Sequence, residues 1–113
     1  MFKPCNRPNI KHEFINDTMQ DEHWYRHENY YGVFEKYEGI YFASIIKDGE
    51  DSTNILPHCL SMIREWVDKH NYIGICCKDT RRGKLLTNRI ASNFKEVVRL
   101  VKSGEICVII EKR

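Results

Sequence analysis

Aromatic and β-branched residues dominate two short stretches near the middle of the chain, residues 30–37 and 40–46. Glu38-Gly39 lies between them, and a two-residue connection ending in glycine is typical of a tight hairpin turn. We therefore expect an antiparallel hairpin over residues 30–46.

Helical spacing follows over residues 57–70, with charged residues on the opposite face. The apolar positions of this stretch recur every three or four residues and are Leu60, Ile63, Trp66 and Val67. Pro57 suits the first turn of a helix, and His70-Asn71 suits its end. This pattern predicts one amphipathic helix.

The last third of the chain reads as strand, helix and hairpin. Residues 73–77 form a short apolar run, residues 78–84 a basic turn, and residues 80–92 carry the second helical pattern. Two apolar arms, 97–101 and 106–110, are joined by a polar connection that contains glycine, which predicts a terminal hairpin.

The beginning of the chain carries weaker signals. Residues 1–15 have no sustained period and predict an irregular arm, whereas residues 16–29 predict a short helix capped by Asp17. Residues 52–56 predict a brief edge strand. The pattern as a whole predicts one domain over residues 1–113 of mixed α/β (α+β) class, with a mainly antiparallel central sheet and two principal helices.

Composition is that of a globular domain, with 42% hydrophobic and 30% charged residues. No apolar run approaches the ~20 residues of a membrane-spanning helix, and the start shows no signal-peptide pattern. The five cysteines are odd in number and show no paired framework. We therefore expect reduced thiols, a cytoplasmic location and no membrane association.

Charge is uneven along the chain. The net charge is +2, but from Lys78 onward ten basic residues face four acidic ones, which leaves the first 77 residues at −4. Such asymmetry favours an anionic ligand, whether a phosphorylated cofactor, nucleic acid or an acidic protein surface, although a solubilising surface explains it equally well. The candidate anion- or partner-binding residues are Lys78, Arg81, Arg82, Lys84 and Arg89.

Aromatic residues near the N-terminal third supply a second candidate surface. Trp24 and Tyr25 are candidates for a partner-binding patch, and together with Tyr30, Tyr31 and Tyr41 they are candidates for stacking on single-stranded nucleic acid.

Metal and thiol chemistry find little support. His23 and His27 are four apart, the spacing that a helical metal site uses, but no third ligand is identifiable, so no metal site is predicted. His58 and Cys59 are adjacent and would diverge on a helix, which argues against a nucleophilic pair.

The order of hairpin, strand, helix, strand, helix and closing hairpin over residues 30–113 resembles the GNAT superfamily of acyl-CoA-dependent N-acetyltransferases, and most of all its short, divergent bacteriophage members, which include acetyltransferase-like internal virion proteins. Residues 91–96 are similar to the family's helix-to-strand junction, with Asn93 where the family has a left-handed glycine.

The resemblance departs from the family at the phosphate-binding loop. The family uses Arg/Gln-x-x-Gly-x-Gly/Ala, whereas residues 56–62 contain neither glycine nor arginine. A second alignment places the loop at residues 80–86, which makes Arg81, Arg82 and Lys84 the cofactor-binding candidates.

The resemblance also implies where catalytic groups would lie. The candidates for a catalytic acid or base are Glu35, Tyr37 and Glu38, on the central hairpin. The last helix lacks the tyrosine that usually serves the family as general acid.

These features favour a non-catalytic GNAT-like viral protein that needs no cofactor and binds a protein partner, as a host-factor inhibitor in the host cytoplasm or as a virion component. The alternatives are an acetyl-CoA-dependent N-acetyltransferase acting on a protein amine, and a small nucleic-acid-binding protein.

Overall fold

The structure, a computed structural model, describes residues 1–12, 15, 18–49 and 54–113. Over these residues the chain forms one seven-stranded sheet, in the order β1-β2-β3-β4-β5-β7-β6, and two helices. The elements are β1 Lys3–Cys5, β2 His23–His27, β3 Tyr30–Tyr37, β4 Ile40–Lys47, α1 Leu56–His70, β5 Tyr72–Lys78, α2 Arg81–Ala91, β6 Lys95–Lys102 and β7 Glu105–Glu111. β4 and β5 are parallel, and the other neighbouring strands are antiparallel. The predicted mixed α+β class, mainly antiparallel sheet and two helices are therefore confirmed.

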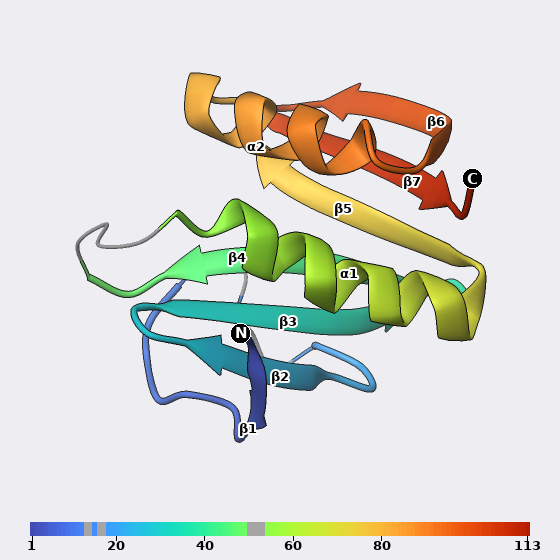
Figure 1. The fold of residues 1–113 in the computed structure, drawn as a ribbon. Coiled ribbons are helices and arrows are strands. Elements are labelled where there is room, and N and C mark those ends of the chain that lie inside the picture. The colour runs from blue at the N-terminus through green and yellow to red at the C-terminus, as the bar shows by residue number, and fades with distance from the viewer. Residues whose placement is uncertain (13–14, 16–17, 50–53) are drawn as a thin grey trace.

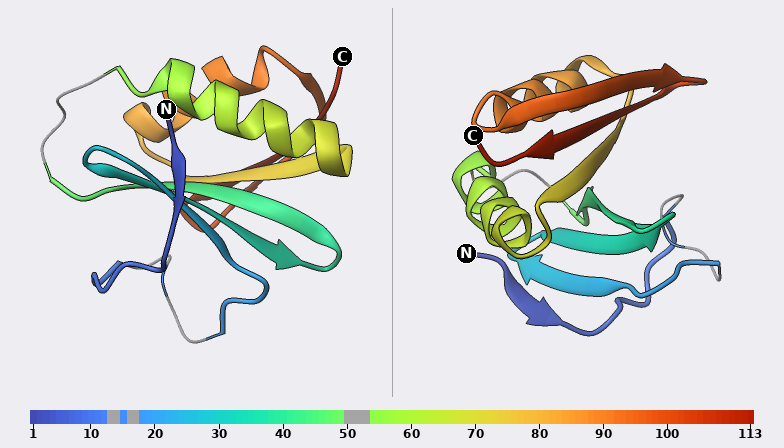
Figure 2. Two further views of the ribbon diagram at one scale, coloured as in Figure 1. Left: turned by 60° about the horizontal axis from the view of Figure 1, so that its bottom comes forward. Right: turned by 90° about the vertical axis from the view of Figure 1, so that its right-hand side faces the viewer.

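Both helices lie on the same face of the sheet (Figure 1). The two views of Figure 2 show α1 and α2 together on this face, with the strands behind them. α1 connects β4 to its parallel neighbour β5, a connection that must cross from one end of the sheet to the other. The buried residues of α1 recur at helical spacing and are Cys59, Met62, Ile63, Trp66 and Val67. The predicted helix over residues 57–70 is thus confirmed, and its apolar face forms the main core against the sheet.

Tight turns set the register of both predicted hairpins. Glu38 and Gly39 join β3 to β4 with φ values of 49° and 84°. Ser103 and Gly104 join β6 to β7 with φ values of 41° and 83°. Two successive residues with positive φ are what the type I′ turn requires, and its twist matches that of the flanking strands.

A second, smaller cluster lies on the sheet face away from the helices. It is formed by Trp24, Tyr31, Val33 and Ile46. Side chains of the chain's first 19 residues, among them Ile10 and Met19, pack against it. The N-terminal segment therefore serves as the cover of this face.

The predicted helix over residues 16–29 is wrong. Residues 23–27 form β2, which pairs with β3 from His27↔Tyr30 to His23↔Phe34. Only two residues connect β2 to β3, so the two strands pair next to each other in the chain. Trp24 is buried in the strand, and this pairing and burial outweigh the local helix signals. The predicted cap, Asp17, lies outside the described residues.

The N-terminal arm is also more ordered than expected. Lys3–Cys5 form β1, which pairs antiparallel with β2, so the prediction of an irregular segment is wrong for these residues.

Three further local expectations need correction. Of the predicted edge strand over residues 52–56, residues 52 and 53 lie outside the described residues, and Leu56 opens α1. Residues 81–84, assigned to a basic turn, form the first turn of α2. Asn93 does not have the left-handed φ expected of it, and its side-chain amide instead donates to the Arg89 carbonyl at 2.9 Å.

Within the described residues, neither helix combines the length and the apolar character that crossing a membrane requires.

Candidate functional site

A cleft opens where β4 and β5 separate. The two strands pair over three positions, Tyr41–Ala43 with Ile73–Ile75, although β4 continues to Lys47 and β5 to Lys78. A cavity of about 510 Å³ lies between the diverging ends. We refer to it as the β4–β5 cleft. The carboxyl ends of parallel strands are where open sheets commonly bind ligands, so this is the candidate site.

The floor of the β4–β5 cleft is apolar. Its side chains come from both strands and from both helices and include Ala43, Ile45, Ile63, Ile75, Leu86 and Ile90. Several of them, such as Ile63 and Ile90, also belong to the main core. The cleft is therefore a hollow in the hydrophobic core that remains open at the surface.

The rim of the cleft is basic. Lys47, Lys78 and Arg82 line it, and no acidic side chain is among the described residues that do so. The N-terminus of α2 also lies there, capped by Thr80, whose hydroxyl oxygen accepts the Gly83 N–H at 3.1 Å. A helix N-terminus carries partial positive charge, so strand and helix together present a cationic rim over an apolar floor.

Gly83 lets α2 approach β5 closely at this rim. A Cβ atom at this position would lie 2.5 Å from the Lys78 carbonyl oxygen. Any larger residue would push the start of α2 away from the strand.

The predicted basic cluster divides in the structure. Lys78 and Arg82 reach the cleft, and Arg82 also lines an adjoining hollow of about 470 Å³ together with Arg89. Lys84 instead pairs with Asp79, with Nζ 2.9 Å from Oδ1. Arg81 is exposed and lines neither hollow.

Most residues of the cleft were not among the candidates from sequence, and three of them have titratable side chains at its surface. His12 reaches it from the N-terminal segment, Lys47 from the end of β4, and Cys77 from β5. Burial raises the pKa of the Cys77 thiol. Lys47 directly follows an apolar stretch of the sequence and ends β4, which was a usable signal, whereas nothing local marks His12.

The candidate catalytic residues lie elsewhere. Glu35 and Tyr37 point to the sheet face away from the helices, because they alternate with Phe34 of the main core. Together with Glu38 they line a second hollow of about 820 Å³ on that face. Burial, and then the nearby Glu22, raise the pKa of Glu35.

The expectation of an exposed aromatic patch is wrong for Trp24, which is 5% exposed. Tyr25 packs against Trp66, whose indole N–H donates to the Tyr25 hydroxyl oxygen at 3.0 Å. Tyr30 and Tyr31 are buried as well. These side chains hold the sheet together and do not form a stacking surface.

His23 and His27 are on a strand and have separate neighbours. His23 Nε2 lies 3.2 Å from an Asp21 carboxylate oxygen, and the His27 ring stacks on that of His58 at 3.9 Å. The described part of the chain holds no group of three or more His, Cys, Asp or Glu side chains arranged for a metal.

The start of α1 offers few hydrogen-bond donors. Ile55 occupies the N-cap position without a side-chain cap, and Pro57 follows in the first turn. The Leu56 N–H is already taken by the Asn54 side-chain oxygen at 3.3 Å. Proline has no N–H, so this helix start is poorly equipped to hold an anion.

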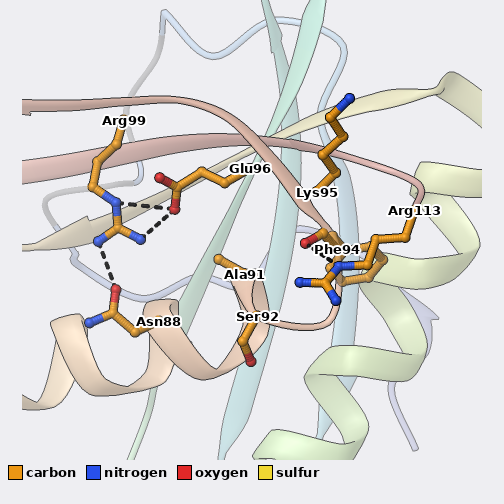
Figure 3. Close-up of a pocket in the computed structure, with 8 residues that line it drawn as sticks. All are labelled: Asn88, Ala91, Ser92, Phe94, Lys95, Glu96, Arg99 and Arg113. Atoms are coloured by element: carbon orange, nitrogen blue, oxygen red, sulfur yellow. Dashed lines mark hydrogen bonds and ion pairs between the residues drawn. The ribbon is translucent and has the colours of Figure 1, made fainter.

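A shallow hollow lies at the other end of α2, against β6 (Figure 3). Arg99 is bound there by Glu96, with Nη2 2.7 Å from Oε1, and by the Asn88 side-chain oxygen at 2.7 Å. Arg113 donates to the Phe94 carbonyl at 3.0 Å. The Arg99–Asn88 hydrogen bond ties β6 to α2. Both arginines of this hollow are engaged by protein groups, so the β4–β5 cleft is the better candidate site.

Comparison with models of known protein families, with curated proteins and with solved structures finds no significant match to this chain.

Proposed function

We propose that this chain is a GNAT-like scaffold that binds a protein partner and does not transfer an acyl group. The element order supports the likeness, because a hairpin, α1, β5, α2 and a closing hairpin follow one another as the resemblance implies. The parting of β4 and β5 provides a ligand-sized cleft on such a scaffold.

The start of α1 is the observation that argues most strongly against catalysis. The family holds the diphosphate of CoA at this position with glycines that let several N–H groups approach it. Here Pro57 removes one donor and Asn54 occupies another. A diphosphate would lose most of the charge-assisted hydrogen bonds that usually hold it.

The chemistry of the β4–β5 cleft supports an acidic partner segment. A cationic rim formed by Lys47, Lys78 and Arg82 surrounds an apolar floor. A segment with carboxylates beside an apolar side chain complements both features, since the floor can bury the apolar side chain and the rim carries the opposite charge. Because the element order resembles that of short bacteriophage members of the family, we expect such a partner among host factors or virion proteins.

One observation favours active acetyl transfer as a second candidate function. The pKa of Glu35 is raised by burial, and Glu35 lines a hollow together with Tyr37. A carboxyl with a raised pKa is a usual general base.

Titration with acetyl-CoA in a calorimeter separates the two. We expect no heat at millimolar ligand, and micromolar binding, about −8 kcal/mol, would overturn the proposal. Capture of partners from a host lysate tests the proposed partner binding, comparing the parent chain with the Lys78→Glu/Arg82→Glu variant, which changes two residues of the rim. The Lys3→Glu/Lys69→Glu variant makes the same charge change far from the cleft and should capture partners as the parent does. Equal capture by both variants would remove the basic rim from the proposal.

A further inference from the structure

β6 forms an open edge of the sheet. It pairs with β7 on one side, and all eight of its residues are exposed. The opposite edge, β1, has three residues and contains Pro4, which are common ways of blocking further pairing. β6 is longer and contains no proline, and no strand of the described residues pairs with its outer side, so another strand can add there.

The usual protection of an edge strand is weak here. Four apolar side chains of the strand are exposed: Val97 at 50%, Val98 at 39%, Leu100 at 59% and Val101 at 65%. Arg99 does not guard the edge, because Glu96 and Asn88 hold its guanidinium against α2 (Figure 3). The irregularity in β6 is confined to residues 96–98, which leaves Val98–Lys102 as a regular stretch.

We propose that two copies of this chain pair through β6, antiparallel, about a twofold axis at Leu100. Residues that lie directly opposite one another in a sheet have their side chains on the same face. A twofold axis perpendicular to the joined sheet must therefore set one residue of β6 opposite the same residue of the other copy. An axis at Arg99 would oppose two arginines, which is unfavourable. An axis at Val101 would set Arg99 opposite Ser103, which lies in the turn beyond the end of β6.

The axis at Leu100 uses the whole regular stretch. It sets Leu100 against Leu100 of the other copy, and Arg99 against Val101 of the other copy. It also sets Val98 against Lys102 of the other copy, whose methylene chain covers the valine. Each long cation therefore faces an apolar residue, and the strand is complementary to itself.

The pairing also extends an existing apolar strip. Leu100 lies opposite Cys107 of β7, and Cys107 lies opposite Cys76 of β5, all on the face away from the helices. Joining two copies at Leu100 continues this strip across both sheets and covers the side chains that one copy leaves exposed. The cleft takes no part, so the inference goes beyond the proposed function and does not depend on it.

Sedimentation of the full chain at concentrations up to about 100 µM tests the pairing. We expect a concentration-dependent species of twice the 13.5 kDa chain mass. Leu100→Lys and Leu100→Glu should each weaken it at least tenfold, because each sets like charges opposite one another. An equimolar mixture of the two should restore it, because Lys then faces Glu.

Leu85→Lys is the matched control, since Leu85 is 54% exposed on α2 and away from the edge. It should leave dimerisation unchanged, and circular dichroism should show all variants folded. A chain that stays monomeric throughout, a dimer indifferent to Leu100→Lys, or a mixture no better than its components would each overturn the inference.

Discussion

Replacing Gly74 by alanine tests the joint that holds the two halves of the sheet together. Gly74 lies opposite Phe42 in the short parallel pairing of β4 and β5. The Phe42 ring crosses directly over it, so that a Cβ atom would lie 2.9 Å from the ring Cγ and nearer still to Cδ1 and Cε1. The ring fills the space that any side chain at this position would need.

The expected loss follows from two opposing terms. Forcing a methyl group into this contact costs about 1–3 kcal/mol, because the ring must leave its place. Alanine also restricts the unfolded chain, which returns roughly 0.4–1 kcal/mol. We therefore expect Gly74→Ala to lower the free energy of unfolding by about 1–2 kcal/mol, which corresponds to roughly 4–8 °C in melting temperature for a domain of this size.

Urea denaturation followed by circular dichroism measures the loss, with two further variants for comparison. Gly32→Ala should cost less, because its Cβ would meet Cε of Met62 at 2.7 Å, the flexible end of a side chain. Combining Gly74→Ala with Phe42→Ala should cost less than the two single changes added together, because removing the ring removes the clash. Additive losses, or a Gly74→Ala variant as stable as the parent, would refute the close packing of Phe42 on Gly74.

Three other outcomes are expected. Arg81→Glu/Arg82→Glu should change the free energy of unfolding by less than about 1 kcal/mol in a thermal melt, because exposed charges contribute little. The two new carboxylates would also lie in the first turn of α2, where the helix dipole favours acids and the parent chain has none. Burial raises the pKa of Cys59 to about 12, so native Cys59 should react with iodoacetamide at about pH 8 roughly a hundredfold or more slower than in urea, by mass spectrometry. The hydrogen bond from the Tyr41 hydroxyl holds the pKa of Asp21 below its ordinary value, so Asp21 contributes stability above about pH 4 that is lost as the pH falls through the lower folded value. Asp21→Asn should therefore flatten the pH dependence of the melting temperature below about pH 4, and an unchanged profile would contradict this role.

Elements whose signals are local were predictable. The turns Glu38-Gly39 and Ser103-Gly104 require positive φ, and each lies between apolar strands, so both hairpins follow from short-range patterns. α1 carries its apolar residues at helical spacing, so its bounds were close to those expected.

The misplaced element shows where local signals end. Residues 23–27 lie in a region with helix-capping signals, yet they pair with β3 and bury Trp24. The stability of a strand depends on packing against its neighbouring strand, and the local pattern does not specify where that neighbour lies. The same reason explains why Trp24 and Tyr25 were expected on the surface.

The candidate site divides in the same way. The charge excess from Lys78 onward was visible along the chain, and two of its members, Lys78 and Arg82, do line the cleft. His12 and Lys47 join them because the N-terminal segment and the end of β4 reach the same place.

The sequence by itself determined the two hairpins, the two helices and the basic character of the C-terminal part, because each depends on residues close together in the chain. The tertiary structure alone decided that β4 and β5 pair over three positions and then part, that His12 and Lys78 both line the resulting cleft, and that β6 is left at an edge of the sheet. These features depend on contacts between residues far apart in sequence, and those contacts form only when the whole sheet assembles.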